Sequence, residues 1–109
     1  MLLQQRHIST NGIRLSFTEN GKEIARVFLY LLKNDLHKET FGFLEDLFVH
    51  ETYRGKGNGE KIVRAAIQEA KRQGCYKLVG TSRYARKHVH AFYKKLGFKD
   101  YGKEFRMEL

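Results

Sequence analysis

The sequence has no proline, a single cysteine and no long apolar run, and each shortage excludes a class of protein. One cysteine, Cys75, cannot form a disulfide within the chain, so we interpret it as a small core residue rather than a nucleophile. No apolar stretch approaches the roughly 20 residues of a membrane span, and Met1 to Thr10 lacks the long apolar centre of a signal peptide. We therefore expect a cytoplasmic protein that does not enter a membrane.

The chain also lacks linker sequences. Its 109 residues, 41% of them apolar, contain no proline-rich, serine-rich or repetitive segment. That length supplies enough apolar material for one small core. We predict a single domain over residues 1–109.

Positive charge is unevenly distributed along the chain. Residues 1–50 hold six basic and six acidic side chains, whereas the rest holds fifteen basic and six acidic, so the whole net charge of +9 lies in the second half. A basic half attracts anionic ligands, which include both phosphorylated cofactors and nucleic acid. Surface lysines can also serve solubility alone, so the charge leaves these classes open.

Hydrophobic periodicity predicts alternating strands and helices. Asn20-Gly21 is the favoured central pair of a type I′ hairpin turn, so the chain should open with an antiparallel hairpin. A strand, helix and strand after residue 41 imply a right-handed parallel crossover. The predicted fold is α/β, with two helices packed on a mixed, twisted sheet. The expected strands cover residues 13–19, 22–33, 41–50, 76–82 and 103–109, and the expected helices cover 59–73 and 87–96.

The run Tyr53-Arg54-Gly55-Lys56-Gly57-Asn58-Gly59 lies between a predicted strand and a predicted helix. Its glycines allow close approach of the backbone to a ligand, and the helix start offers unpaired N–H groups, so the run can hold a phosphate. It is not a P-loop, because Gly59 is followed by Glu60 and Lys61 rather than by Lys and Ser or Thr. Its glycine spacing does not match the dinucleotide fingerprint either.

Three motifs together resemble the GNAT N-acetyltransferase superfamily. The first is R-x-x-G-x-G at Arg54, Gly57 and Gly59, which is similar to the coenzyme A pyrophosphate loop of these enzymes. The second is Leu44-Glu45-Asp46-Leu47-Phe48-Val49, similar to their central strand, especially in enzymes that acetylate polyamines and amino-sugar phosphates. The third is residues 91–98, which end in Y-x-x-x-G-F. The resemblance covers roughly residues 40 to 109.

The resemblance implies a set of cofactor contacts. Leu47 and Val49 should offer backbone groups to the pantetheine arm of acetyl-coenzyme A. Arg86 stands where relatives commonly carry an asparagine that contacts the cofactor, and an arginine there could reach a phosphate. The expected pyrophosphate contacts, by backbone N–H groups, are Arg54, Gly55, Lys56, Gly57, Asn58, Gly59 and Glu60.

The resemblance also implies an acid and a base. Glu45 is the expected general base, with Asp46 as the alternative, and successive strand residues should place the two carboxylates on opposite faces. Tyr93, in the Y-x-x-x-G-F motif, is the expected general acid that protonates the departing thiolate. The simpler interpretations are a solvent-facing carboxylate at either position and a core aromatic at Tyr93.

The resulting hypothesis is an acetyl-coenzyme A dependent N-acetyltransferase that uses direct transfer in a ternary complex. Its acceptor would be a small-molecule amine or a protein amine. No metal is expected, because His88 and His90 face different directions on a helix. The alternative is a non-catalytic basic module that binds nucleic acid or an acidic protein.

We also expect a homodimer. GNAT enzymes usually begin with a strand and two helices that form one wall of the acceptor groove, and here Met1 to Gly12 precede the hairpin. A second copy could complete the groove and cover part of the surface that eight Phe and six Tyr residues create.

Overall fold

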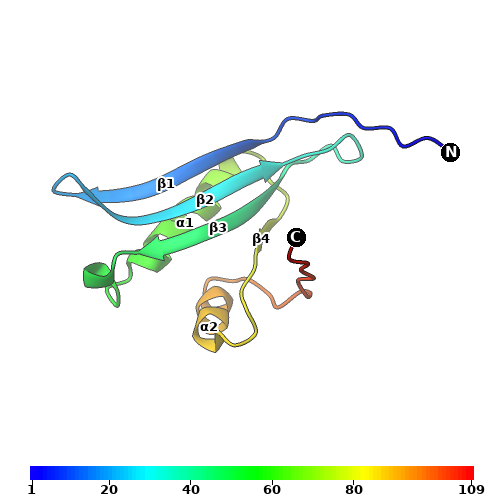
Figure 1. The fold of residues 1–109 in the computed structure, drawn as a ribbon. Coiled ribbons are helices and arrows are strands. Elements are labelled where there is room, and N and C mark those ends of the chain that lie inside the picture. The colour runs from blue at the N-terminus through cyan, green and yellow to red at the C-terminus, as the bar shows by residue number, and fades with distance from the viewer.

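The computed structural model describes residues 1–109, and its centre is a four-stranded sheet in the order β1-β2-β3-β4. The first three strands are antiparallel, and β4 runs parallel to β3, which confirms the predicted mixed α/β sheet. Neither helix combines the length and apolar character needed to cross a bilayer. The elements, shown in Figure 1, are β1 (Asn11–Glu19), β2 (Lys22–Leu32), β3 (Phe41–Val49), η1 (Glu51–Tyr53), α1 (Asn58–Arg72), β4 (Leu78–Gly80) and α2 (Lys87–Lys95).

The opening hairpin turns at Asn20 and Gly21. Their φ angles are 52° and 77°, and Glu19 pairs with Lys22 across the turn. Positive φ at both central residues is the signature of a type I′ turn, whose twist matches that of the strands. The sequence prediction of this turn is therefore confirmed.

The core lies between α1 and one face of the sheet. Ile62, Val63, Ala66 and Ala70 of α1 are buried, as the helical periodicity predicts, and they form one cluster with side chains of β2 and β3. Each fully buried Val, Leu or Ile side chain contributes roughly 1.5–3 kcal/mol, and each alanine contributes less. The sheet residues of this cluster are Ala25, Val27, Leu29 and Leu44.

α1 ends in a left-handed glycine. Gly74 has φ +80°, its N–H donates to the Lys71 carbonyl, and the Cys75 N–H donates to the Ala70 carbonyl. These two bonds form a Schellman motif, which confirms the predicted helix stop.

The parallel pairing of β3 with β4 is short. It joins Gly42 to Leu78, Phe43 to Val79 and Leu44 to Gly80, and then it stops. From Glu45 onward, β3 is therefore paired with β2 on one edge and with no strand on the other edge. In Figure 1 the chain leaves β4 toward α2, which lies beside this unpaired half of β3.

The predicted strand over residues 103–109 is wrong. This segment forms no strand, and Phe105, Met107 and Leu109 are exposed. The charged side chains between them pair with each other, since Arg106 contacts both Glu104 and Glu108. Alternation defines the two faces of a potential strand but supplies no neighbouring strand to pair with.

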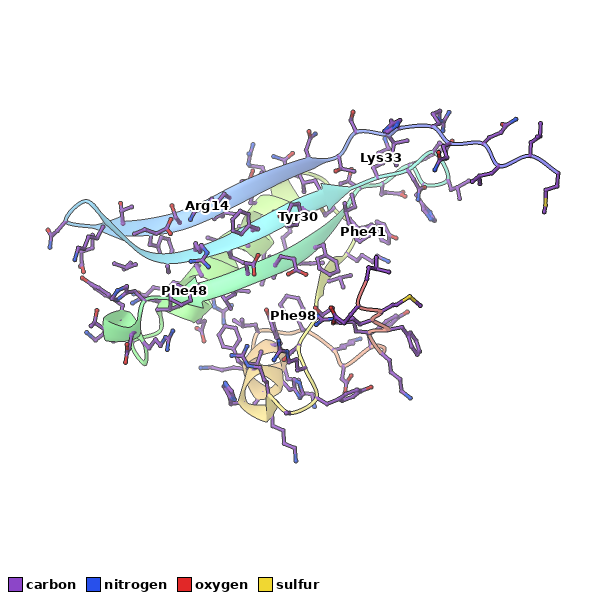
Figure 2. All side chains as sticks on the ribbon, in the orientation of Figure 1. Arg14, Tyr30, Lys33, Phe41, Phe48 and Phe98 are labelled. Carbon is purple, nitrogen blue, oxygen red and sulfur yellow. The ribbon has the colours of Figure 1, made fainter.

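The sheet face opposite α1 carries no helix. In Figure 2, Arg14, Tyr30 and Phe48 lie along β1, β2 and β3 on the side turned away from α1. The rings of Phe28 and Tyr30 stack with centroids 6.3 Å apart, and Arg14 lies over Phe28. Tyr30 and Phe48 remain 40% and 39% exposed.

Candidate active site

The loop between η1 and α1 is a cradle of unpaired backbone donors. Gly55 and Gly57 have φ angles of +74° and +82°, a conformation that glycine adopts without steric cost. Gly57 is the N-cap of α1 and offers no side-chain cap. None of the N–H groups of residues 55–60 donates to a backbone carbonyl, whereas Lys61 N–H bonds the Gly57 carbonyl. Open donors at the positive end of a helix form a site for a phosphate or pyrophosphate.

Side chains near the cradle shape the loop. The Asn58 side-chain amide donates to the Tyr53 carbonyl over 3.0 Å, and the Lys56 ammonium lies 5.6 Å from the centre of the Tyr53 ring. Lys56 is exposed, so its charge faces solvent beside the open N–H groups. The backbone N–H of Arg54 already donates to the Glu51 carbonyl, so Arg54 adds no free amide to the cradle.

The start of α1 is joined to α2. Gly59 packs against the Phe92 ring and Val49: a Cβ atom at Gly59 would lie 3.8 Å from the ring, an ordinary van der Waals contact. The Glu60 carboxylate contacts Lys95 of α2 at 3.2 Å and Arg64 at 3.3 Å. Lys95 first and Arg64 second lower the pKa of Glu60 below its ordinary value. Glu60 thus links the cradle to the helix that carries Tyr93, while its backbone N–H stays free.

A β-bulge interrupts β3 at the predicted base. Phe28 pairs with Glu45 and Arg26 with Phe48, so Asp46 and the next residue together face the single Val27 of β2. Asp46 has φ +53°, and both carboxylates are exposed. The expectation that Glu45 and Asp46 lie on opposite faces assumed a regular strand, and the bulge breaks the two-residue period at this point.

The bulge also sets the directions of the residues after it. Leu47 and Val49 turn their side chains toward the core beneath α1, whereas Phe48 is exposed on the open face. The backbone of this half of β3 has no β4 partner, which leaves its edge accessible beside the cradle.

The Y-x-x-x-G-F run forms the C-terminal cap of α2. The N–H of Phe98 donates to the Tyr93 carbonyl, that of Gly97 donates to Lys94, and Gly97 has φ +101°. This Schellman motif brings Phe98 onto Tyr93, with ring centroids 5.1 Å apart. The motif therefore fixes the Tyr93 ring, which also packs against Gly80, where a Cβ atom would lie 3.7 Å from the Tyr93 hydroxyl.

Tyr93, Glu45 and Arg86 share one electrostatic environment. Burial raises the pKa of Tyr93 above its ordinary value, the negative charge of Glu45 raises it further, and the positive charge of Arg86 lowers it. A raised pKa keeps the phenol protonated at neutral pH, as a proton donor requires. Tyr93 is thus a core aromatic whose hydroxyl is exposed to the charges of the candidate site.

The structure therefore places Glu45 and Arg86 within electrostatic reach of Tyr93, and it joins the start of α1 to Val49 of β3 and to Phe92 and Lys95 of α2. Sequence reasoning missed Gly80, Phe92 and Lys95. An isolated glycine in a strand does signal close backbone approach, so Gly80 could have been found. Lys95 and Phe92 contact residues of the cradle that lie more than thirty positions earlier in the sequence, and no local sequence pattern predicts such contacts. No group of three or more His, Cys, Asp and Glu side chains is arranged to hold a metal ion.

Comparison with known proteins identifies relatives of this chain. The model of the acetyltransferase (GNAT) family matches residues 3–98. A glucosamine 6-phosphate N-acetyltransferase from Trypanosoma brucei brucei is 34% identical over 68 residues, which are 62% of this chain and 44% of that protein. N-alpha-acetyltransferase 30 from Schizosaccharomyces pombe is 28% identical over 81 residues, which are 72% of this chain and 54% of that protein. The chain thus spans about half the length of these curated relatives.

Solved structures share the fold. A Trypanosoma brucei acetyltransferase superposes with a TM-score of 0.82 at 25% identity, covering 90% of this chain and 69% of that one. Glucosamine-6-phosphate N-acetyltransferase from Arabidopsis thaliana superposes with a TM-score of 0.79 at 26% identity, covering 89% and 66%.

Proposed function

This chain belongs to the acetyltransferase (GNAT) family, and we propose that it transfers an acetyl group from acetyl-coenzyme A to a primary amine. The observation that carries the proposal is the cradle of unpaired N–H groups at residues 55–60, next to an unpaired strand edge. Such donors suit the pyrophosphate of coenzyme A, and the basic second half of the chain supplies a favourable field.

The proposed reaction needs two proton transfers, one from the acceptor ammonium and one to the departing sulfur, and side chains of the protein would carry out both. An alkyl ammonium with a pKa near 10.4 is neutral in only about one molecule in a few thousand at pH 7, a penalty of roughly 4 to 5 kcal/mol. We assign Glu45, directly or through a water, as the base that accepts the ammonium proton. Asp46, exposed beside Glu45 at the bulge, is the alternative base.

Acetyl-coenzyme A supplies an activated acetyl thioester. As the amine nitrogen bonds the acyl carbon and the carbon–sulfur bond breaks, Tyr93 donates its phenolic proton to the departing sulfur. Tyr93 is held at the end of α2 by its contacts with Phe98 and Gly80, so little reorientation is needed.

For the acceptor we propose an amine that also carries an anionic group, such as an amino-sugar phosphate. Two observations support it: the curated relatives include glucosamine 6-phosphate N-acetyltransferases, and the charges near Tyr93 combine the acidic Glu45 with the basic Arg86. A protein N-terminus is the second candidate, because N-alpha-acetyltransferase 30 is also similar to this chain.

We further propose that the protein works in the cytoplasm as a homodimer. The open sheet face carries the stacked rings of Phe28 and Tyr30 and the partly exposed Phe48, and a second copy could cover these rings.

The test is an assay of free thiol release from acetyl-coenzyme A. Glucosamine 6-phosphate, glucosamine, spermidine and short peptides with free N-termini serve as acceptors. Faster release with the phosphorylated amino sugar than with glucosamine would support the assigned acceptor. Coenzyme A binding without turnover on any amine would instead favour the non-catalytic module, and absence of binding would overturn the proposal.

A further inference from the structure

Arg54, the first residue of the R-x-x-G-x-G run, directs its side chain at the strand that precedes the loop. Its Nε donates to the Val49 carbonyl over 2.8 Å, and its guanidinium carbon lies 5.3 Å from the centre of the Phe48 ring. Its backbone N–H is bonded to the Glu51 carbonyl over 3.3 Å. Both Nε and the backbone N–H of Arg54 therefore have partners within the protein before any ligand is bound.

The Phe48 ring is shared by a second arginine. Arg26 of β2 pairs in register with Phe48, and its guanidinium carbon lies 4.8 Å from the ring centre. Figure 2 shows Phe48 near the end of β3, where the chain continues toward η1. A continuous set of contacts thus runs from β2 through Phe48 to Arg54, at the point where the cradle begins.

We propose that Arg54 is a positioning residue, which fixes the first turn of the cradle to β3 through Phe48 and the Val49 carbonyl, rather than a ligand that neutralises the pyrophosphate. Glycine loses more freedom on ordering than other residues, so a loop with three glycines in five positions needs a fixed start. The inference rests on the proposed function, since it concerns the site assigned to coenzyme A.

The chemistry of arginine separates the two roles. This positioning role needs a planar guanidinium that stacks on a ring while its Nε donates to a carbonyl. The compact ammonium of lysine can lie over a ring or donate a hydrogen bond, but it has no planar group that does both. A ligand that acts through charge alone tolerates lysine. The positioning role also requires the Phe48 ring, whereas an arginine that binds the pyrophosphate directly would not need that ring.

The first experiment is calorimetric titration with coenzyme A of Arg54→Lys, Phe48→Leu and the double variant. We expect each single variant to bind about tenfold more weakly, and the double variant to be no weaker than the single ones, because both remove one contact set. The dependence of affinity on salt should stay that of the wild type, since charge is kept. The KM for acetyl-coenzyme A should rise while kcat at saturation stays unchanged.

The control is Arg72→Lys. Arg72 is exposed at the far end of α1, where it pairs with Glu69, so this variant makes the same chemical change away from the cradle. It should bind coenzyme A as the wild type does.

A second experiment needs no ligand. Hydrogen exchange at the bonded amides of Tyr53, Arg54 and Lys61 reports whether the loop is held. We expect faster exchange there in Arg54→Lys and Phe48→Leu, and wild-type exchange in Arg72→Lys. Any one of three results would overturn the positioning role of Arg54. These results are wild-type affinity in Arg54→Lys, additive losses of affinity in the double variant, and unchanged exchange in both single variants. A wild-type protein that does not bind coenzyme A would overturn the proposed function, while the exchange rates would still decide the role of Arg54.

Discussion

The surroundings of Tyr93 keep its phenol protonated at neutral pH, as the proposed role of general acid requires. Burial and the charge of Glu45 both disfavour the phenolate, so the pKa lies above its ordinary value, while Arg86 opposes the rise. Phe92 and Phe98 contact the ring edge to face, with centroids 5.4 and 5.1 Å away. The aromatic contacts fix the ring and the charges set its acidity, so one hydroxyl can be removed without disturbing the packing.

Tyr93→Phe tests this separation. The change removes the proton donor and keeps the ring, so we expect turnover to fall by about 10²- to 10⁴-fold, as is typical for the loss of a general acid. Affinity for coenzyme A and the melting temperature should change little. Steady-state kinetics and calorimetry measure both, and a variant with wild-type kcat would exclude Tyr93 as the acid.

Glu45→Gln removes the proposed base and one neighbour of Tyr93. The rate should fall most at low pH, where fewer acceptor amines are already neutral. Because the Glu45 charge raises the pKa of Tyr93, its removal should lower that pKa and move the alkaline decline of activity to lower pH. The measurement is the pH profile of kcat/KM. A larger loss in the matched Asp46→Asn variant would reassign the base to Asp46.

At the scale of elements, local sequence patterns predicted most of the sheet and both helices. The i, i+3, i+4 stripe of α1 and the Asn20-Gly21 turn act within a few residues, so the sequence alone carries the information. The expected helix over residues 59–73 differs from Asn58–Arg72 by one residue at each end.

The incorrect predictions concern features that depend on contacts between segments far apart in the sequence. The strand expected over residues 76–82 shrinks to Leu78–Gly80, because β3 and β4 separate after Leu44. The bulge at Asp46 depends on register with β2, and the absent strand at residues 103–109 depends on a neighbour that the pattern cannot supply. The cradle itself was predicted, but its link to α2 through Glu60 and Lys95 joins elements far apart in sequence.

Gly57→Glu tests the cradle as an element. Gly57 has φ +82°, and no atom lies within 4 Å of the position that a Cβ would take, so a side chain there would face open space next to the free N–H groups. We expect coenzyme A affinity to collapse, because a carboxylate would repel the pyrophosphate and the backbone would be strained. The control is Gly21→Glu, which places the same residue at positive φ in the hairpin turn, away from the cradle. Equal binding by the folded Gly57→Glu variant, measured by calorimetric titration, would contradict the assignment.

The whole molecule is extended for its length. Its radius of gyration is 16.1 Å, compared with about 13 Å for a typical compact domain of 100 residues. Ten of its 109 residues are buried, and eight of these form the apolar cluster between the sheet and α1. The opposite sheet face, with its stacked Phe28 and Tyr30 and the partly exposed Phe48, is a region where a second copy could add burial.

We expect the protein to form a homodimer in which this face is covered. Light scattering at assay concentrations measures the mass directly. Tyr30→Glu should shift the protein to monomer, because it places a charge among the stacked rings of the open face, far from the α1 core. The control is Tyr101→Glu, which makes the same change at a side chain that is 95% exposed near the end of the chain.

If the dimer completes the acceptor groove, the Tyr30→Glu monomer should lose acetyl transfer while it still binds coenzyme A through the cradle. A wild-type monomer with full activity would contradict the dimer and require that the acceptor itself complete the groove.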